Sequence, residues 1–476
     1  MLFFINEILK SFRSCFSRKA AYCWFVVIVV GLMIRDDNLG VTSVIRSLGL
    51  RPECYETMMH FFRSSAYTLD CIAVCWYRAV WKYAPLYRED GRVVLIGDGV
   101  KQSKEGLFMP AVKKLHQESE DSSKAEYIFG HMFGGIGVLA QKCSKWFCIP
   151  LRFTIQDGLR ETADWEGSTY SKESHVVQMI QSGYQAASTT FGESIIVLDR
   201  YFLTVSALQT LKNLNGDSTQ LQVVTKAKRN CTAYENAPAY TGIGRPRRKG
   251  AAVKVANLFD SEHDKFQKAD VTIYGKVQTL QYYSCDLLWG KGLYMPLRFV
   301  LVILDGAECI LASTDLSLSP LAIIRLYSYR ENIECCFREF KQCIGGFCYH
   351  FWTKATPKLN HFQKKGDCSP LSLVQNGAER NRILATIRAT ETFVQLSVIA
   401  MGIVQMLSLK YSQLCPGGAF RYLRTPSKEI VSEATLMVYL RKHFWRFTSF
   451  SPDLPIVQII HSQQVKTGIF NDSMAS

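Results

Sequence analysis

The chain has 476 residues, 48% of them hydrophobic and 12% aromatic, which excludes a disordered protein and supplies a large core divided into about two to four domains. Lys and Arg number 56 against 41 Asp and Glu, a formal net charge of +15. An excess of this size favours a polyanionic partner, nucleic acid first and an anionic membrane surface second.

Residues 1–90 are predicted to form a helical N-terminal region, because apolar residues recur at spacings of three and four through "VTSVIRSLGL" and the segment 55–83. The region either binds DNA or serves only as a packing unit. Within it, residues 20–34 form an uncharged run of fifteen, shorter than the about 20 residues of a spanning helix. We expect a buried core helix here, with a membrane anchor as the alternative.

Residues 91–229 alternate between short apolar runs and amphipathic segments. Three β-type runs, "VVLIG", "YIFGHMFGGIGVLAQ" and "WFCIPLRFTI", come first. A helix at 174–188, the strand "SIIVL", a helix at 203–214 and the strand "LQVVTKAKR" follow. Adjacent strands followed by alternating helices and strands predict a mixed α/β sheet flanked by helices.

Two aspartates directly follow apolar runs of this sheet. "VVLIGDG" places Asp98 at the end of one predicted strand, and "SIIVLDRYF" places Asp199 at the end of another. A strand fixes a carboxylate in position while the open end of the sheet admits a ligand. Either aspartate alone is more often a turn residue, so their meaning depends on what lies beside them.

Residues 230–310 are predicted to be β-rich, with the runs "VTIYGKVQTLQYYSCDLLW" and "MPLRFVLVIL" separated by basic and glycine-containing loops. The densest cationic stretch of the chain, "GRPRRKG", lies here and contributes Arg245, Arg247, Arg248 and Lys249. This stretch is either a solvated loop or a contact for nucleic-acid phosphates.

The segment "YSYRENIECCFREFK" carries four polar residues that a helix would bring together. At about 100° per residue, Tyr327, Arg330, Glu334 and Lys341 share one narrow face, beside an apolar face typical of a helix packed on a core. Pro320 suits the start of this helix, and the glycine pair after residue 344 suits its end. Taken alone, Arg330 and Glu334 are equally an ordinary surface pair four residues apart.

The remaining features are less specific. Residues 311–420 are predicted to be helical and include a long apolar helix at 380–407, and residues 421–476 form a mixed C-terminal tail. Sixteen cysteines are scattered without paired C-x-x-C sets, which indicates reduced thiols in a cytoplasmic protein. His131 and His350 have no partner in the sequence and are predicted to be structural.

The three carboxylates Asp98, Asp199 and Glu334 could together hold two hard divalent cations through oxygen ligands. Two metals in one site activate an attacking oxygen and stabilise a leaving oxygen in phosphoryl displacement, which suits DNA phosphodiesters. Arg330 and Lys341 would favour the ionised form of Glu334.

The polar residues of the predicted helix and the two aspartates also resemble the motif of a known protein family. The tyrosine, arginine, glutamate and lysine of the predicted helix resemble the signature around the catalytic glutamate in DDE transposases of the insertion-sequence 4 type. Asp98 and Asp199 resemble that family's two aspartates in order and context, at spacings of 101 residues between them and 135 residues to Glu334. The resemblance covers roughly residues 90 to 420. It implies a ribonuclease-H-like α/β core formed by residues 91–229 and 311–420, with a β-rich insertion at 230–310 before the last catalytic helix.

Carried over residue by residue, the resemblance implies that Asp98, Asp199 and Glu334 form the catalytic triad. They would also hold the metal, Mg²⁺, for which Mn²⁺ can substitute.

The resemblance further implies contacts to DNA. Tyr327, Arg330 and Lys341 would contact phosphates of the transposon end. Some transposases of this type flip a base near the cleavage point onto a tryptophan in the β insertion. Trp289 is the candidate by location, with core packing as the alternative.

The implied protein is a DNA transposase that cleaves at transposon ends and transfers the 3′-hydroxyl into target DNA. Its partners would be double-stranded DNA, as transposon ends and as target, and a second copy of the chain in a homodimer, with no membrane. It would lie in the cytoplasm, on the nucleoid if the host is prokaryotic. The alternative is a catalytically inactive or domesticated descendant that binds DNA without cutting it, and a membrane-anchored protein is the third hypothesis.

Overall fold

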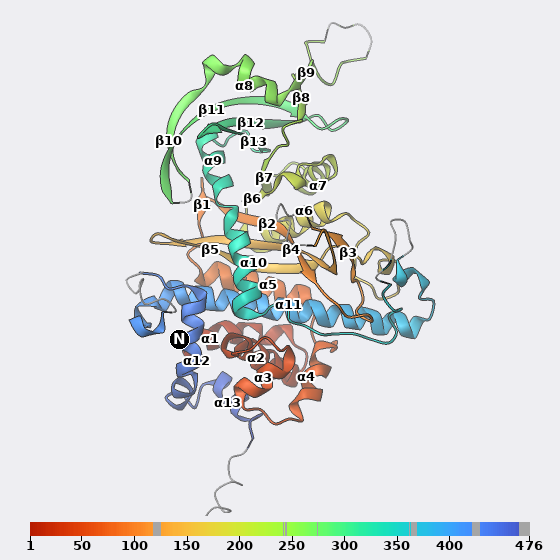
Figure 1. The fold of residues 1–476 in the computed structure, drawn as a ribbon, viewed down its shortest axis with the longest axis vertical. Helices are drawn as coiled ribbons and strands as arrows, with labels where there is room; N and C mark the ends of the chain where they lie inside the picture. The colour runs from red at the N-terminus through yellow and green to blue at the C-terminus, as the bar shows by residue number, and fades with distance from the viewer. Residues whose placement is uncertain are drawn as a thin grey trace, which may run out of the picture.

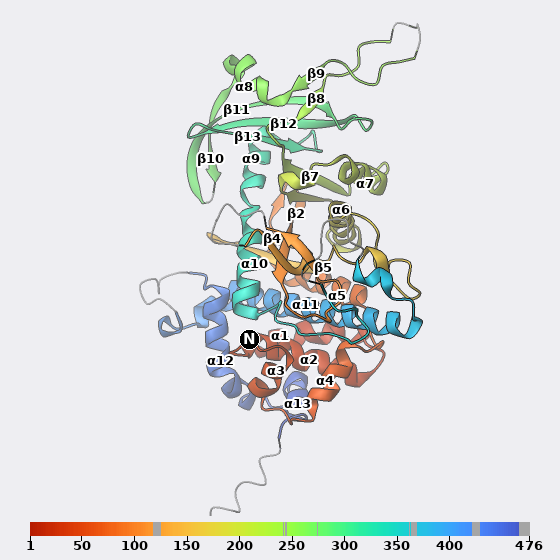
Figure 2. The ribbon, with the colours of Figure 1, turned by 45° about the vertical axis from the view of Figure 1, so that its right-hand side comes forward.

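The computed structural model describes residues 1–117, 125–240, 242, 245–273, 275–360, 362, 369–420 and 429–465. Within them, 13 strands join in one largely antiparallel sheet with helices packed against it (Figure 1). The predicted class, a mixed sheet flanked by helices, is therefore confirmed. Two views place helices from both ends of the chain at one end of the molecule and the strands of residues 232–313 at the other (Figure 2).

The N-terminal region is helical as far as Tyr83. Its second helix lies at the centre, with 13 of its 16 residues buried, and packs against three later helices, α11 (Gly377–Tyr411), α12 (Glu433–Ser449) and α13 (Pro455–His461). The predicted buried core helix at residues 20–34 is therefore confirmed. The five helices are α1 (Leu2–Lys10), α2 (Lys19–Ile34), α3 (Val41–Leu48), α4 (Cys54–Phe62) and α5 (Leu69–Tyr83).

Five strands form the centre of the sheet, in the spatial order β5, β4, β2, β6, β7. The first three pair antiparallel, whereas β2, β6 and β7 run parallel. Parallel neighbours need crossover connections, which contain the helices α6 (His175–Ala186) and α7 (Val205–Asn215). The strands are β2 (Arg92–Ser103), β4 (Tyr127–Lys142), β5 (Lys145–Ile155), β6 (Ser194–Leu198) and β7 (Leu221–Lys226), all at predicted positions.

The β-rich region continues this sheet rather than forming a separate one. Its last strand, β13 (Ala307–Ser313), pairs antiparallel with β7, and Leu311 lies opposite Lys226. The predicted run at 271–289 is two antiparallel strands, β10 and β11. The region contains β8 (Thr232–Tyr234), β9 (Ala252–Lys254), α8 (Leu258–Ser261), β10 (Gln267–Ile273), β11 (Lys276–Trp289) and β12 (Met295–Leu304). Two short strands elsewhere, β1 (Arg88–Glu89) and β3 (Lys113–His116), pair with β2 and β4.

The helix predicted for the "YSYRENIECCFREFK" segment is interrupted. It consists of α9 (Pro320–Ser328), α10 (Glu331–Glu339) and a wider turn at Phe340–Ile344. The start and end lie where predicted, because the Ser319 hydroxyl caps α9 and Gly345 adopts a φ of +62° after the last turn. The break arises where the amide groups of residues 329 and 330 bond carbonyls three residues back instead of four.

Helix α11 lies along the outer edge of β5, whose backbone groups have no neighbouring strand among the described residues. Its buried side chains bond them instead: Gln395 donates to the Leu151 carbonyl oxygen at 3.1 Å, and Gln405 donates to that of Cys148 at 3.2 Å. Among the described residues, only the helix from Gly377 to Leu414 is long and apolar enough to cross a membrane, and its apolar window is wholly buried. The C-terminal region also contains α12 and α13 (Pro455–His461).

Candidate active site

Asp98 and Asp199 lie next to each other because of the register of two parallel strands. Every paired position of β2 and β6 differs by 101 in number, from Val93 with Ser194 to Ile96 with Val197. Asp98 and Asp199 each lie two residues beyond the last pair, so both side chains leave the same face of the sheet. Burial raises the pKa of Asp98 to about 6, and the nearby charge of Asp199 adds to the rise.

The prediction that Asp98 ends a strand is wrong, whereas Asp199 directly follows β6 as predicted. Strand β2 continues to Ser103 through its pairing with β4. Asp98 lies where the parallel pairing with β6 ends, which opens the sheet beside it without ending β2.

One guanidinium joins two of the predicted catalytic carboxylates. Arg330 donates from Nη1 to Oδ2 of Asp98 at 2.8 Å, and from Nη2 to Oε1 of Glu334. Burial acts to lower the pKa of Arg330, but the charges of Asp98 and Glu334 outweigh burial and raise it. The Tyr327 hydroxyl completes the group by donating to Oδ1 of Asp199 at 3.4 Å. The structure therefore brings together five of the residues singled out from the sequence.

A glycine allows α10 to lie this close to the sheet. Gly135 on β4 is the cross-strand partner of Asp98. A Cβ atom at Gly135 would lie 2.8 Å from ring atoms of both Phe153 on β5 and Phe337 on α10. A larger residue would therefore push α10 away from the strand that carries Asp98.

Lys341 does not join the carboxylates. It lies in the wide turn after α10, and burial lowers its pKa. Within the described part of the chain, it makes no hydrogen bond or ion pair. The end of this turn is held by Arg35, which donates from Nη2 to the carbonyl oxygens of Ile344 at 2.5 Å and Gly345 at 3.0 Å.

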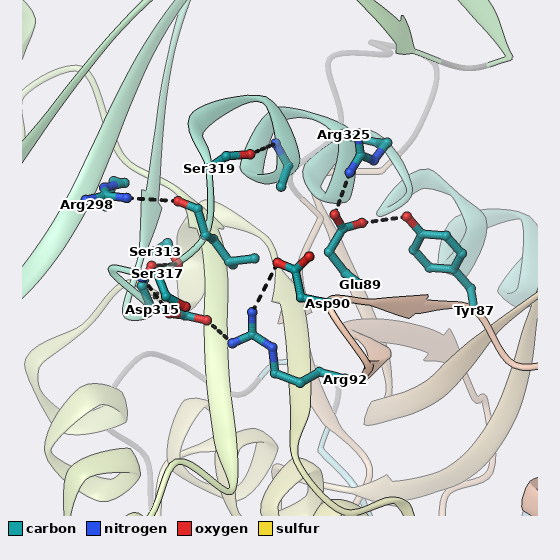
Figure 3. Close-up of polar contacts among 12 residues, drawn as sticks. Tyr87, Glu89, Asp90, Arg92, Arg298, Ser313, Asp315, Ser317, Ser319 and Arg325 are labelled. Carbon is teal, nitrogen blue, oxygen red and sulfur yellow. Dashed lines mark hydrogen bonds and ion pairs between the residues drawn. The ribbon is translucent and has the colours of Figure 1, made fainter.

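A polar network that the sequence did not indicate ties α9 to the start of β2, the strand that carries Asp98 (Figure 3). Arg92, the first residue of β2, pairs with Asp315 in the segment before α9. Glu89 accepts from Arg325 of α9 at 2.5 Å and from the Tyr87 hydroxyl at 2.5 Å. These contacts fix α9, and with it Tyr327, against β2. Arg92 and Asp315 are 223 residues apart, so no local sequence motif predicts their contact.

A pocket of about 320 Å³ is lined by Trp289 and by Arg200, the residue that follows Asp199 in the chain. Tyr234, Lys228 and Lys291 also line it. Arg200, Lys228, Tyr234 and Lys291 were not predicted from the sequence, although Arg200 adjoins a predicted catalytic aspartate.

The predicted cationic loop lies close to this pocket. The Lys249 ammonium lies 3.5 Å from the ring centre of Tyr234, and Arg248 donates to the carbonyl oxygen of Gly292 at 3.0 Å. Arg245 and Arg247 are exposed. Lys249 therefore packs on a side chain of the pocket wall, whereas Arg245 and Arg247 face solvent.

A larger cavity, of about 720 Å³, lies between α5, β5, α6 and α11. None of the predicted site residues lines it. It is therefore separate from the carboxylates.

The donor atoms at the carboxylates suit a hard divalent cation, because carboxylate oxygens are the ligands that Mg²⁺ prefers. The adjacent Asp98 and Asp199 and the guanidinium against Asp98 show that this place attracts positive charge. Within the described ranges, no three Asp, Glu, His or Cys side chains converge on a single metal position. Asp98, Asp199 and Glu334 are the residues that could contribute ligands to such an ion, and Arg330 lies between the first and the last.

His131 is a structural residue, as predicted. Its Nε2 must donate to the Pro110 carbonyl oxygen at 2.8 Å, so its Nδ1 accepts from the Tyr349 hydroxyl at 2.7 Å. Burial lowers the pKa of His131 to about 4. His350 is exposed, and burial of part of its ring lowers its pKa.

Comparison of the chain with protein-family models, curated proteins and solved structures gives no match.

Proposed function

We propose that this chain is a DNA transposase that cleaves at transposon ends and transfers the resulting 3′-hydroxyl into target DNA, with Mg²⁺ or Mn²⁺ in its site. One observation carries the proposal. Asp98, Asp199 and Glu334 are far apart in sequence, yet Arg330 and the β2–β6 register gather them at one place. These are the residues that the insertion-sequence 4 resemblance assigns to catalysis.

The core is proposed to be ribonuclease-H-like. Three antiparallel strands followed by two parallel ones, with helices in the crossovers, support this. Glu334 lies on a helix, α10, that packs against the face of the sheet that carries both aspartates, and this also supports the proposed fold.

Bound metal would supply activation of the attacking oxygen and stabilisation of the leaving oxygen. The side chains would orient the substrate. Arg330 has the planar donor set that matches a phosphate, and Glu334, with its side chain 55% exposed, faces solvent where DNA can approach. In cleavage, a water oxygen bonds to phosphorus as the bond to the 3′ oxygen breaks. In transfer, that 3′-hydroxyl attacks a target phosphodiester and a target 3′ oxygen leaves.

The remaining predicted contacts are proposed as a DNA path beside the carboxylates. The pocket around Trp289 offers an aromatic face for an unstacked base, with Arg200, Lys228 and Lys291 for the adjoining phosphates. Arg245, Arg247, Arg248, Lys249 and Lys341 would contact backbone phosphates. A homodimer that holds two transposon ends, in the cytoplasm or on the nucleoid, completes the proposal.

The test is nicking of a supercoiled plasmid that carries the coding segment with its native flanking DNA, with Mg²⁺ or with EDTA. Wild type should nick at the element's boundaries only with metal, and Glu334→Gln should not nick but should still bind DNA in a gel-shift assay. Glu331→Gln is the matched control, since Glu331 is an exposed acid on the same turn of α10 and should leave nicking unchanged. DNA binding by wild type with no cleavage under any metal would favour the inactive descendant instead.

A further inference from the structure

The site has few free oxygens for a cation, because its own donors already occupy them. Both oxygens of Asp98 have a partner: Oδ1 accepts from the Gly99 amide at 2.7 Å, and Oδ2 accepts from Arg330 at 2.8 Å. The Gly99 amide belongs to the neighbouring peptide and cannot leave. Arg330 is therefore the partner that must move before a metal ion can bind Oδ2.

Arg330 also occupies one oxygen of Glu334, Oε1, through its second terminal nitrogen. A single side chain thus occupies two of the three carboxylates that would hold the metal. The Arg330 side chain is only 18% exposed and that of Asp98 only 23%, so the guanidinium cannot withdraw into water and leave Asp98 uncompensated, because an unpaired, partly buried charge is costly. Its departure requires a cation at the carboxylates and an anion for itself.

DNA supplies the anion. A phosphate accepts two parallel hydrogen bonds from a guanidinium, as a carboxylate does, so a phosphate beside the site can replace both carboxylates as the partner of Arg330. The carboxylates then carry three negative charges without an internal counter-ion, which favours a divalent cation.

We propose that Arg330 is an exchangeable counter-ion, which blocks Asp98 and Glu334 against metal in the free protein and moves to a phosphate when DNA binds. DNA and metal therefore bind cooperatively. This inference rests on the proposed function and adds to it an order of assembly.

Thermodynamic linkage makes the effect reciprocal: DNA raises the affinity for metal by the same factor as metal raises the affinity for DNA, typically about 5- to 150-fold for coupled sites. Screening acts in the opposite direction, because added cations normally weaken DNA binding. A rise in DNA affinity on adding metal at constant ionic strength is therefore diagnostic of coupling between metal binding and DNA binding.

The first experiment measures Mn²⁺ binding without DNA, from the electron paramagnetic resonance signal of the free ion. Arg330→Gln should bind Mn²⁺ about fivefold or more tightly than wild type. Arg338→Gln is the matched control, because it removes one positive charge from the same helix, one turn beyond Glu334, where Arg338 contacts Glu339 instead. Its affinity should stay within about twofold of wild type. An equal gain in both variants would mean a general charge effect and would overturn the proposal.

The second experiment measures binding of a duplex from the flanking DNA with and without Ca²⁺ at constant ionic strength. Wild type should gain about fivefold or more in affinity, and Arg330→Gln should gain nothing. If wild type shows no gain while the plasmid is still nicked, Arg330 is a fixed cross-link and only this inference fails. If no protein binds Mn²⁺ and the plasmid stays intact, the proposed function fails with it.

Discussion

The guanidinium of Arg35, at the end of α2, donates a hydrogen bond of 2.5 Å to the carbonyl oxygen of Ile344, at the end of the helix that carries Glu334. The same side chain also bonds the Gly40 carbonyl oxygen at 2.9 Å and the Ser43 hydroxyl at 3.0 Å. Arg35 is 1% exposed, and among the described residues it has no carboxylate partner. The carbonyls at a helix C-terminus carry partial negative charge, and they stabilise the positive charge of Arg35 there. The N-terminal helices thus fix the far end of the helical segment that carries Glu334.

Replacing Arg35 by Met should lower the free energy of unfolding by about 2–4 kcal/mol, because buried carbonyls lose a charged donor. Burial lowers the pKa of Arg35 to about 10, so the charge is present at neutral pH. Urea unfolding measures the change. Arg46→Met is the control, because Arg46 pairs with Asp37 at the surface and should change stability by less than about 1 kcal/mol. Equal effects would show that the Arg35 contacts add nothing.

Gly135→Ala should cost about 1–3 kcal/mol in stability, because the new methyl group overlaps the rings of Phe153 and Phe337. Since the overlap displaces α10, plasmid nicking should fall at least about tenfold. Gly377→Ala is the matched control, as no atom of the described residues lies within 4 Å of a Cβ there. Normal nicking by folded Gly135→Ala protein would show that the placement of α10 tolerates the shift.

Trp289→Ala should reduce plasmid nicking by about tenfold or more while duplex binding stays near wild type, because stacking of one base on an aromatic ring contributes about 1–3 kcal/mol. Single-turnover cleavage measures the rate. Trp352→Ala serves as control, since Trp352 is 53% exposed but does not line the pocket. Unchanged nicking by Trp289→Ala would assign Trp289 to packing.

His131 makes stability depend on pH. Its pKa is lowered to about 4 from an ordinary value of 6.5, so between these values the unfolded chain binds the proton and the folded protein does not. The free energy of unfolding should therefore fall as pH falls from 6.5 to 4, by at most about 3 kcal/mol from this group. His131→Gln should remove that share of the slope in urea titrations, and Tyr349→Phe, which keeps the imidazole, should retain it. Identical slopes in wild type and His131→Gln would contradict the assignment.

Local patterns predicted the elements with strong apolar runs. The runs that became β2, β4, β5, β6 and β7 are rich in Val, Ile and aromatic residues, and the structure has strands at all five. The short strands β3 and β13 went unpredicted, because four and seven mixed residues carry little signal and their pairing is set by distant partners.

Local sequence patterns also did not predict the helix break before α10. No glycine or proline marks it, and the apolar spacing continues through Tyr329. The cause is tertiary, since α9 packs against β7 and β13, whereas α10 packs against β2 and β5 in another part of the sheet. The site residues could be named from their motif, but the central position of Arg330 between Asp98 and Glu334 required the folded chain.

Gln395→Leu should lower the free energy of unfolding by about 1–3 kcal/mol, because the Leu151 carbonyl oxygen on β5 is left buried without a donor. Thermal and urea unfolding measure the loss. Ser397→Ala on the same helix is the control, since within the part of the chain that the structure describes its hydroxyl bonds only a carbonyl oxygen of its own helix, that of Phe393. Equal stability of the two variants would show that water replaces Gln395.

The side chains of α11 along β5 also affect the association of one molecule with another. An uncovered strand edge is a template on which a strand from another copy can add, and long apolar edges promote such association. With Glu391, Gln395 and Gln405 bonded to its backbone, β5 offers no such row of groups to a neighbour. A chain that ended before α11 would therefore lose more than a core helix: its sheet would be open to growth by intermolecular strand pairing.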